Sequence, residues 1–96
     1  MSGDADRPVV AVVDDQERVV EAFAFWLEDD YEVRRATGGP GALSVIDGAV
    51  DVVLLDRHMP QLSGDDVLAE LRERGLDCRV AMVTAVDPEL AIVDLP

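Results

Sequence analysis

Three short apolar runs in this chain each lead directly into a polar side chain suited to phosphate chemistry. The runs are 9–13, 52–55 and 80–83, and the polar residues that follow them are Asp14 and Asp15, then Asp56, then Thr84. The carboxyl ends of parallel strands share one edge of a sheet, and open α/β folds place their sites at that edge. The sequence therefore predicts that these four residues converge on one pocket.

Strand-like runs alternate along the chain with segments of helical period. Strands are expected at 9–13, 31–35, 50–55 and 79–83. Helices are expected from Glu17 to the pair Asp29-Asp30, after the turn 37–40 as far as a cap at Gly48, from the cap Ser63 to Gly75, and from the cap Asp87 onward. This alternation predicts an α/β fold, a doubly wound parallel sheet covered on both faces.

Helical spacing marks a stripe of large apolar side chains on the first expected helix. Phe23, Trp26 and Leu27 lie on this stripe, which is expected to pack in the core and not to hold a cofactor. In the second expected helix, Leu43 and Ile46 should face the core in the same way.

Composition indicates a single globular domain and excludes some classes of binding partner. The chain has 96 residues, so it forms one domain at most, and its 49% hydrophobic content indicates a packed globule. A net charge of −13 argues against binding of nucleic acid or an anionic membrane. All eight basic residues are Arg; an acidic surface without Lys is typical of cytoplasmic proteins of halophiles, although codon bias also depletes Lys.

Cellular location follows from what the sequence lacks. The single Cys78 permits no internal disulfide, and it is expected to be a small apolar residue near a buried strand. The N-terminus carries no pattern of a secretory signal, and no apolar run is long enough to cross a bilayer. The expectation is a cytoplasmic protein that does not bind membranes.

The carboxylates suit a hard divalent cation. Three of them at one sheet edge would repel one another, and Mg²⁺ resolves this repulsion while leaving a position for a phosphate oxygen. An Asp side chain also serves as the nucleophile in phosphoryl transfer, and Asp56 follows a rigid strand and precedes a loop. The Thr84 hydroxyl is suited to donate a hydrogen bond to a phosphoryl oxygen.

Together these motifs resemble the receiver domain of two-component response regulators. The residues that carry the resemblance are Asp14-Asp15, Asp56 with Met59-Pro60 and Gly64 after it, and Thr84-Ala85. It covers residues 8–96 as one receiver domain, preceded by a disordered tail at 1–7. The Lys-free composition, with segments 55–57 and 83–86, looks like haloarchaeal regulators that carry a HalX output domain.

The resemblance implies a role for each site residue. Asp56 would accept a phosphoryl group from the phospho-His of a sensor histidine kinase. Asp15 and Asp56 would ligate Mg²⁺ together with the backbone carbonyl of His58, and Asp14 would act through water. Thr84 would bond the phosphoryl group and move as a switch. Such a domain is a phosphorelay component and not an enzyme, apart from self-catalysed phosphorylation and dephosphorylation of Asp56.

The sequence also departs from the family pattern. Receivers have the flavodoxin-like strand order 2-1-3-4-5 and carry a Lys after the fifth strand; this chain contains no Lys and ends before a fifth strand and last helix. The expectation is a receiver incomplete at its C-terminus, with an output domain further along a longer chain. Loss of that helix would expose Trp26 or its neighbours, so a homodimer is a further possible partner arrangement.

Two other functions were weighed against phosphoacceptance. A degenerate, non-phosphorylated receiver would act as a protein-interaction module; the missing Lys favours it and the intact acidic trio opposes it. A phosphatase of the haloacid dehalogenase type needs a second Asp two residues after the nucleophile, where this chain has His58, so that function is rejected.

Overall fold

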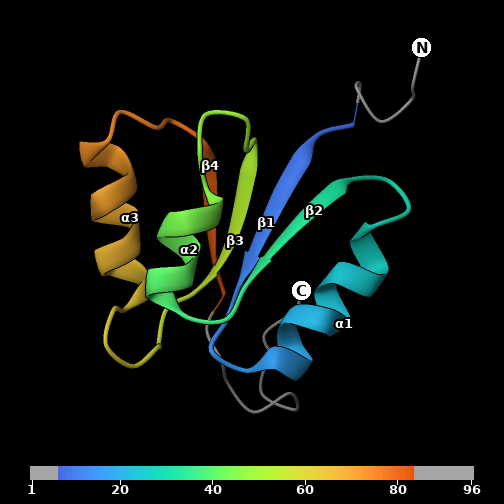
Figure 1. The fold of residues 1–96 in the computed structure, drawn as a ribbon, viewed down its shortest axis with the longest axis horizontal. Helices are drawn as coiled ribbons and strands as arrows, with labels where there is room; N and C mark the ends of the chain where they lie inside the picture. Colours follow the sequence, from blue (N-terminus) through green and yellow to red (C-terminus); the bar gives the residue numbers. More distant parts are fainter. Residues whose placement is uncertain (1–6, 84–96) are drawn as a thin grey trace, which may run out of the picture.

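The computed structural model describes residues 7–83, which form an alternating α/β unit (Figure 1). Its elements are β1 (Val9–Val13), α1 (Glu17–Leu27), β2 (Glu32–Ala36), α2 (Gly39–Val45), β3 (Val52–Asp56), α3 (Gly64–Glu73) and β4 (Arg79–Val83). Every element predicted within this range is present, and most boundaries differ by one or two residues. Of the tail predicted at 1–7, only Arg7 is described, and it donates to the Glu28 carbonyl at 3.2 Å. Thr84 and the helix expected from Asp87 lie outside the described residues.

All strand pairs in the described part of the chain are parallel, in the order β2-β1-β3-β4. This order confirms the predicted flavodoxin-like arrangement; residues 7–83 contain no fifth strand. In the register of the sheet, Val13 is opposite Leu55 and Asp56 is opposite Val83. The carboxyl ends of the two central strands therefore meet at one edge.

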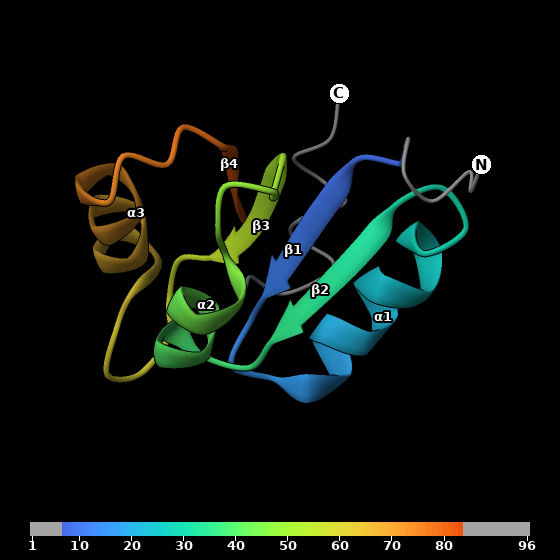
Figure 2. The same cartoon turned by 45° about the horizontal axis from the view of Figure 1, so that its top comes forward.

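The two faces of the sheet bury different side chains because consecutive residues of a strand point to opposite faces. Ala11 and Val13 of β1 belong to a core cluster with residues of α2 and α3, whereas Val10 and Val12 pack with Val20 of α1. In Figure 2, α2 and α3 lie together on one side of the sheet and α1 lies on the other. Such burial on both faces explains why β1 is an unbroken apolar run.

The prediction that Trp26 packs in the core is wrong. Trp26 and Phe25 are each 72% exposed, whereas Phe23 and Leu27 are half-buried against the sheet. The fully buried positions of α1 are Val20 and Ala24, so the stripe that faces the sheet passes beside Trp26 and not through it. The alternative expectation, that the face around Trp26 is exposed, agrees with the structure.

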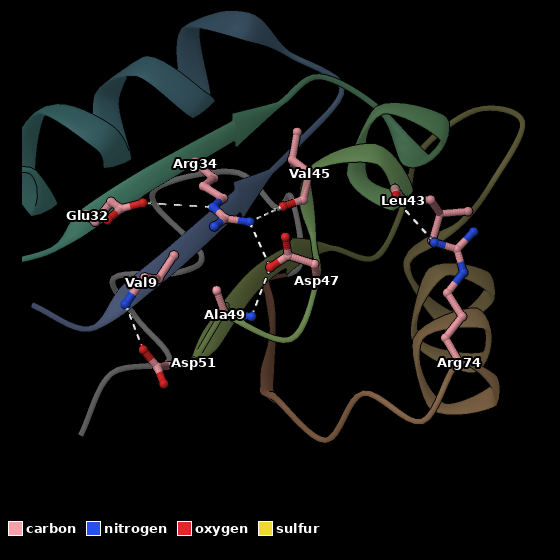
Figure 3. A network of polar contacts seen from close by, with 9 residues as sticks. All are labelled: Val9, Glu32, Arg34, Leu43, Val45, Asp47, Ala49, Asp51 and Arg74. Carbon is pink, nitrogen blue, oxygen red and sulfur yellow. Dashed lines mark hydrogen bonds and ion pairs between the residues drawn. The ribbon is translucent and has the colours of Figure 1, made fainter. Parts of the chain in front are cut away.

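Helix α2 ends at Val45, so the cap predicted at Gly48 is also wrong; the extended residue at the C-cap is Ile46. Two arginines from other elements bind the carbonyls at this end (Figure 3). Arg34 of β2 donates to the Val45 carbonyl at 2.8 Å, and Arg74, just after α3, donates to the Leu43 carbonyl at 3.1 Å. Long-range bonds thus satisfy groups that a local glycine cap would otherwise satisfy.

Helix α3 begins as the sequence predicts. The Ser63 hydroxyl accepts a hydrogen bond from the Asp66 N–H, and the Asp66 carboxylate accepts one from the Ser63 N–H, each at 3.2 Å. This reciprocal pair is a capping box, which fixes where the loop after β3 enters the helix. None of the helices in residues 7–83 is long and apolar enough to cross a membrane.

Candidate functional site

Three carboxylates gather at the carboxyl ends of β1 and β3. Asp14 and Asp15 directly follow β1, and Asp56 is the last residue of β3. One oxygen from each side chain lies within 4.8 Å of the others. Asp56 is 1% exposed and Asp14 is 5% exposed, while Asp15 is open to solvent. The structure therefore brings these three predicted site residues into one cluster, in which Asp14 and Asp56 are buried and Asp15 is accessible to solvent.

Short backbone contacts orient the two buried carboxylates. The Gln16 N–H donates to Oδ1 of Asp14 at 2.9 Å, and the His58 N–H donates to Oδ1 of Asp56 at 3.2 Å. The second oxygen of Asp56, Oδ2, is buried and has no hydrogen-bond partner among the described residues. A buried anionic oxygen without a partner is costly, so this atom is the feature of the cluster that most requires a ligand.

Both buried carboxylates hold their protons more strongly than usual. Burial is the main cause of the raised pKa of Asp14; the Gln16 N–H opposes it, and the negative charge of Asp56 adds to it. The pKa of Asp56 is also raised, chiefly by burial, against the His58 N–H and with a contribution from Asp15. Burial and like charge thus disfavour the ionised cluster in the absence of a cation.

The donor set fits a hard divalent cation. Carboxylate oxygens are the ligands that Mg²⁺ takes in proteins, usually one or two per ion with water completing the shell. Here one carboxylate oxygen from each of the three residues lies within 4.8 Å of the others, so all three side chains can reach one ion. A cation bound there would neutralise the like-charge repulsion that adds to the effect of burial on both pKa values.

The loop between β3 and α3 is fixed closely against Asp56. A Cβ atom at Gly64 would lie 2.5 Å from the Asp56 carbonyl oxygen and 2.8 Å from Cα of Arg57, so the backbones approach at a distance only glycine permits. The Gly64 N–H donates to the Arg57 carbonyl at 2.9 Å. Because of this contact, the start of α3 holds the end of β3 in place.

The same loop contains a tight turn. The Leu62 N–H donates to the Pro60 carbonyl at 2.8 Å, and Gln61 between them has φ of 71°. Hydrogen bonding across three residues with a positive φ at the centre is a γ-turn of the rare type. Met59 is buried in the core and anchors the loop beside it.

The remaining predicted residues stand as follows. The side chain of His58 is exposed, and its backbone N–H points to Asp56. The side chain of Arg57 is exposed and forms an ion pair with Asp65 at 3.7 Å. Thr84 lies outside the described residues, although Val83 before it is paired with Asp56.

Sequence reasoning missed two contributors to the site, the Gln16 N–H and the packing of Gly64 on Asp56. The first is a backbone contact between near neighbours, which any residue except proline would supply at position 16. The second had a visible signal, because Gly64 stands between the cap Ser63 and the acidic first turn of α3, where a glycine has no helix-forming advantage.

The chain is similar in sequence and in structure to known proteins. Residues 10–95 match the family model of the response regulator receiver domain. A candidate transcriptional regulator of Haloferax volcanii is 55% identical over 93 residues, which are 96% of this chain and 16% of that protein. The sensory transduction protein RegX3 of Mycobacterium tuberculosis is 42% identical over 83 residues, which are 84% of this chain and 36% of RegX3.

Among solved structures, the response regulator protein TrrA from Thermotoga maritima, determined in complex with Mg²⁺-BeF, superposes with a TM-score of 0.73 at 33% identity. The match covers 92% of this chain and 76% of the TrrA chain. This chain thus spans about a third of RegX3 and about a sixth of the Haloferax protein.

Proposed function

Because the chain belongs to the response regulator receiver domain family, we propose that it is a phosphoacceptor switch in two-component signal transduction. Asp56 takes a phosphoryl group from the phospho-His of a sensor histidine kinase. The observation that carries the proposal is the state of the Asp56 carboxylate: one oxygen is held by the His58 N–H, and the other is buried beside two further carboxylates without a partner among the described residues.

The two oxygens of Asp56 have separate tasks in this proposal. Oδ1 is held by the His58 N–H, which fixes the plane of the carboxylate. Oδ2 attacks the phosphorus atom; the new O–P bond forms as the P–N bond to the donor imidazole breaks, and the imidazole leaves with the electron pair of that bond. The product is an aspartyl phosphate, and catalysis consists mainly of positioning.

Mg²⁺ is the proposed cofactor. Asp15 and Asp56 would ligate it with the backbone carbonyl of His58, and Asp14 would contact it through water. When bound, the ion would neutralise charge on the phosphoryl oxygens and on the carboxylates. Support comes from the three oxygens within 4.8 Å of one another and from TrrA, a relative solved with Mg²⁺-BeF.

Thr84 is the proposed switch residue. Its hydroxyl would donate a hydrogen bond to a phosphoryl oxygen and draw the following loop inward, a two-state change driven by a new charged group. The register of the sheet supports this role: Val83 is opposite Asp56, and the Arg57 N–H donates to the Val83 carbonyl at 3.2 Å. Residue 84 directly follows that pair.

The wider setting is part of the same proposal. Residues 8–96 act as one receiver domain in the cytoplasm of a halophile, the kinase is the phosphoryl donor, and an output domain in a longer chain carries the response. The similarity to a Haloferax volcanii protein six times as long as the match supports this setting. The net charge of −13 argues against direct contact of this segment with DNA.

Incubation with a small acyl phosphate and Mg²⁺ in concentrated KCl tests the proposal, with intact mass as the readout. We expect one phosphoryl adduct on the wild type and none on Asp56→Asn. Asp29→Asn, an exposed carboxylate after α1, is the matched control and should be modified like the wild type. Chelation of Mg²⁺ should abolish the adduct. An unmodified wild type with native circular dichroism would contradict phosphoacceptance and favour the interaction module.

A further inference from the structure

Glycine at position 39 brings the start of α2 into close contact with the loop between β3 and α3. The two segments lie side by side at the carboxyl edge of the sheet (Figures 1 and 2). Gly39 is buried, and a Cβ atom there would overlap Cβ of Leu62 and lie 2.9 Å from the Leu62 carbonyl oxygen. Only glycine permits this approach, so a larger residue at position 39 must displace one of the two segments.

Helix α2 is the fixed side of this contact. Ala42, which is three residues after Gly39, is fully buried in the core. Arg34 and Arg74 hold carbonyls near the other end of the helix. In the loop, by contrast, four of the five residues 57–61 are exposed, so the loop has free space on its outer side. A Cβ at position 39 would therefore move the loop and not the helix.

The loop is closed at its base, so a displacement of Leu62 is confined to a short stretch of chain. The Gly64 N–H donates to the Arg57 carbonyl at 2.9 Å, which joins the two ends of the loop. Residues 58–63 lie between these ends, and the γ-turn described above takes up part of that stretch. Because the stretch is short, a movement of Leu62 is passed along it to His58, its first residue.

His58 connects this loop to the phosphoacceptor. Its N–H donates to Oδ1 of Asp56 at 3.2 Å, and its carbonyl is a proposed ligand of Mg²⁺. A distance of 3.2 Å is at the long end of the range for such hydrogen bonds, so a small shift of the loop is enough to break this one. Loss of an outer contact that orients metal ligands typically lowers metal affinity about 10- to 100-fold.

We propose that Gly39 is a positioning residue for the phosphoacceptor site. By admitting Leu62 at close range, it fixes the loop that directs the His58 N–H to the Asp56 carboxylate. The extension of this role to Mg²⁺ binding, through the His58 carbonyl, rests on the proposed function. Gly39 acts through the loop and not by contact with the phosphoryl group or the ion.

The amide proton of His58 reports on this positioning in the metal-free protein. In Gly39→Ala its NMR resonance should move upfield, because a hydrogen bond to a carboxylate deshields the proton and the variant lengthens that bond. The Gln16 amide, which donates to the other buried carboxylate, should keep its position. Gly41→Ala is the matched control in the same helix, since its Cβ would make an ordinary 3.6 Å contact with Ala36, and its His58 amide should match the wild type.

Replacement of Leu62 tests whether the effect passes through the contact. Leu62→Gly removes the Cβ atom that the Gly39→Ala side chain would overlap, so Gly39→Ala should shift the His58 amide less in this background than in the wild type. Equal shifts in the two backgrounds would overturn the proposal. If Gly39→Ala does not fold, Leu62→Ala decides, because it loosens the same contact from the loop side. The His58 amide should then shift, and an unchanged amide would overturn the proposal.

Calorimetric titration with Mg²⁺ in concentrated KCl measures the consequence for the site. The dissociation constant of Gly39→Ala should be roughly 10-fold higher than that of the wild type, and that of Gly41→Ala should be unchanged. A wild type that neither binds Mg²⁺ nor accepts a phosphoryl group would contradict the proposed function, and the His58 amide would still decide the role of Gly39. A wild type that does both, with Gly39→Ala matching Gly41→Ala in Mg²⁺ affinity or in the His58 amide, would overturn the role of Gly39 alone.

Discussion

Replacement of Gly64 by Ala should disturb both the stability and the site of this domain. An added Cβ would lie 2.5 Å from the Asp56 carbonyl oxygen. This distance is 0.5 Å shorter than 3.0 Å, the shortest separation that Cβ atoms normally show. It would also lie 2.8 Å from Cα of Arg57. Both obstacles are backbone atoms, so the clash is relieved only if α3 moves away from the end of β3.

Overpacking of this kind costs about 1–3 kcal/mol. Gly48→Ala is the matched control, since an added Cβ there meets no atom within 4 Å and the residue does not have a positive φ. At such a position alanine raises the free energy of unfolding by about 0.4–1 kcal/mol, because it lowers the conformational entropy of the unfolded chain. In a domain of this size, 1 kcal/mol shifts the melting temperature by about 4–8 °C.

Thermal unfolding followed by circular dichroism in concentrated KCl measures both variants. Gly64→Ala should melt at least about 4 °C below the wild type, and Gly48→Ala should melt at or above it. In the folded fraction, Gly64→Ala should also slow phosphorylation of Asp56, because the movement of α3 displaces the Asp56 backbone. A Gly64→Ala protein as stable and as reactive as Gly48→Ala would refute the idea that the glycine holds the site.

Three further predictions concern the carboxylates and the helix ends. The raised pKa values of Asp14 and Asp56 mean that the stability they contribute is complete below the ordinary Asp value of 3.8 and is lost as pH rises through the folded values. Metal-free wild type should therefore gain stability as pH falls through the raised folded pKa values toward 3.8, and Asp56→Asn should gain less; equal gains in urea titrations would contradict this. Ser63→Ala loses the capping box of α3 and should cost about 1 kcal/mol in the same assay, while exposed Ser44→Ala should cost almost nothing. Arg34→Ala removes the bonds to Val45 and Asp47 and should lower the free energy of unfolding by about 1.5–3 kcal/mol. Arg35→Ala removes only exposed ion pairs and should lower it by at most about 1 kcal/mol. Similar losses for the two variants would show that the end of α2 does not depend on Arg34.

The sheet and the acidic cluster were predictable because their signals are local. Apolar β-branched runs such as 9–13 mark buried parallel strands, and the rule that their carboxyl ends share an edge brings Asp14 and Asp56 together without any tertiary information. The capping box at Ser63 is likewise written in four consecutive residues.

The errors have non-local causes. Helix α2 ends at Val45 because Arg34 and Arg74, distant in sequence, bind its last carbonyls, and no local pattern reveals such bonds. The hydrophobic pattern predicts that Trp26 lies in the core, because a large apolar side chain contributes more to such a pattern than the small Ala24. In the structure the small Ala24 is buried against the sheet, whereas Trp26 is exposed beside the buried stripe of α1. A small side chain fits the narrow space between the helix and the sheet, and a bulky one does not.

The central claim is that Asp56 accepts the phosphoryl group at the carboxylate cluster. Borohydride reduces an aspartyl phosphate to homoserine, so peptide mass spectrometry after phosphorylation and reduction identifies the acceptor residue. The account predicts homoserine at position 56, dependent on Mg²⁺, with Asp14 and Asp15 unchanged. Homoserine at position 14 or 15, or reduction at no residue of a folded and phosphodonor-treated chain, would contradict it.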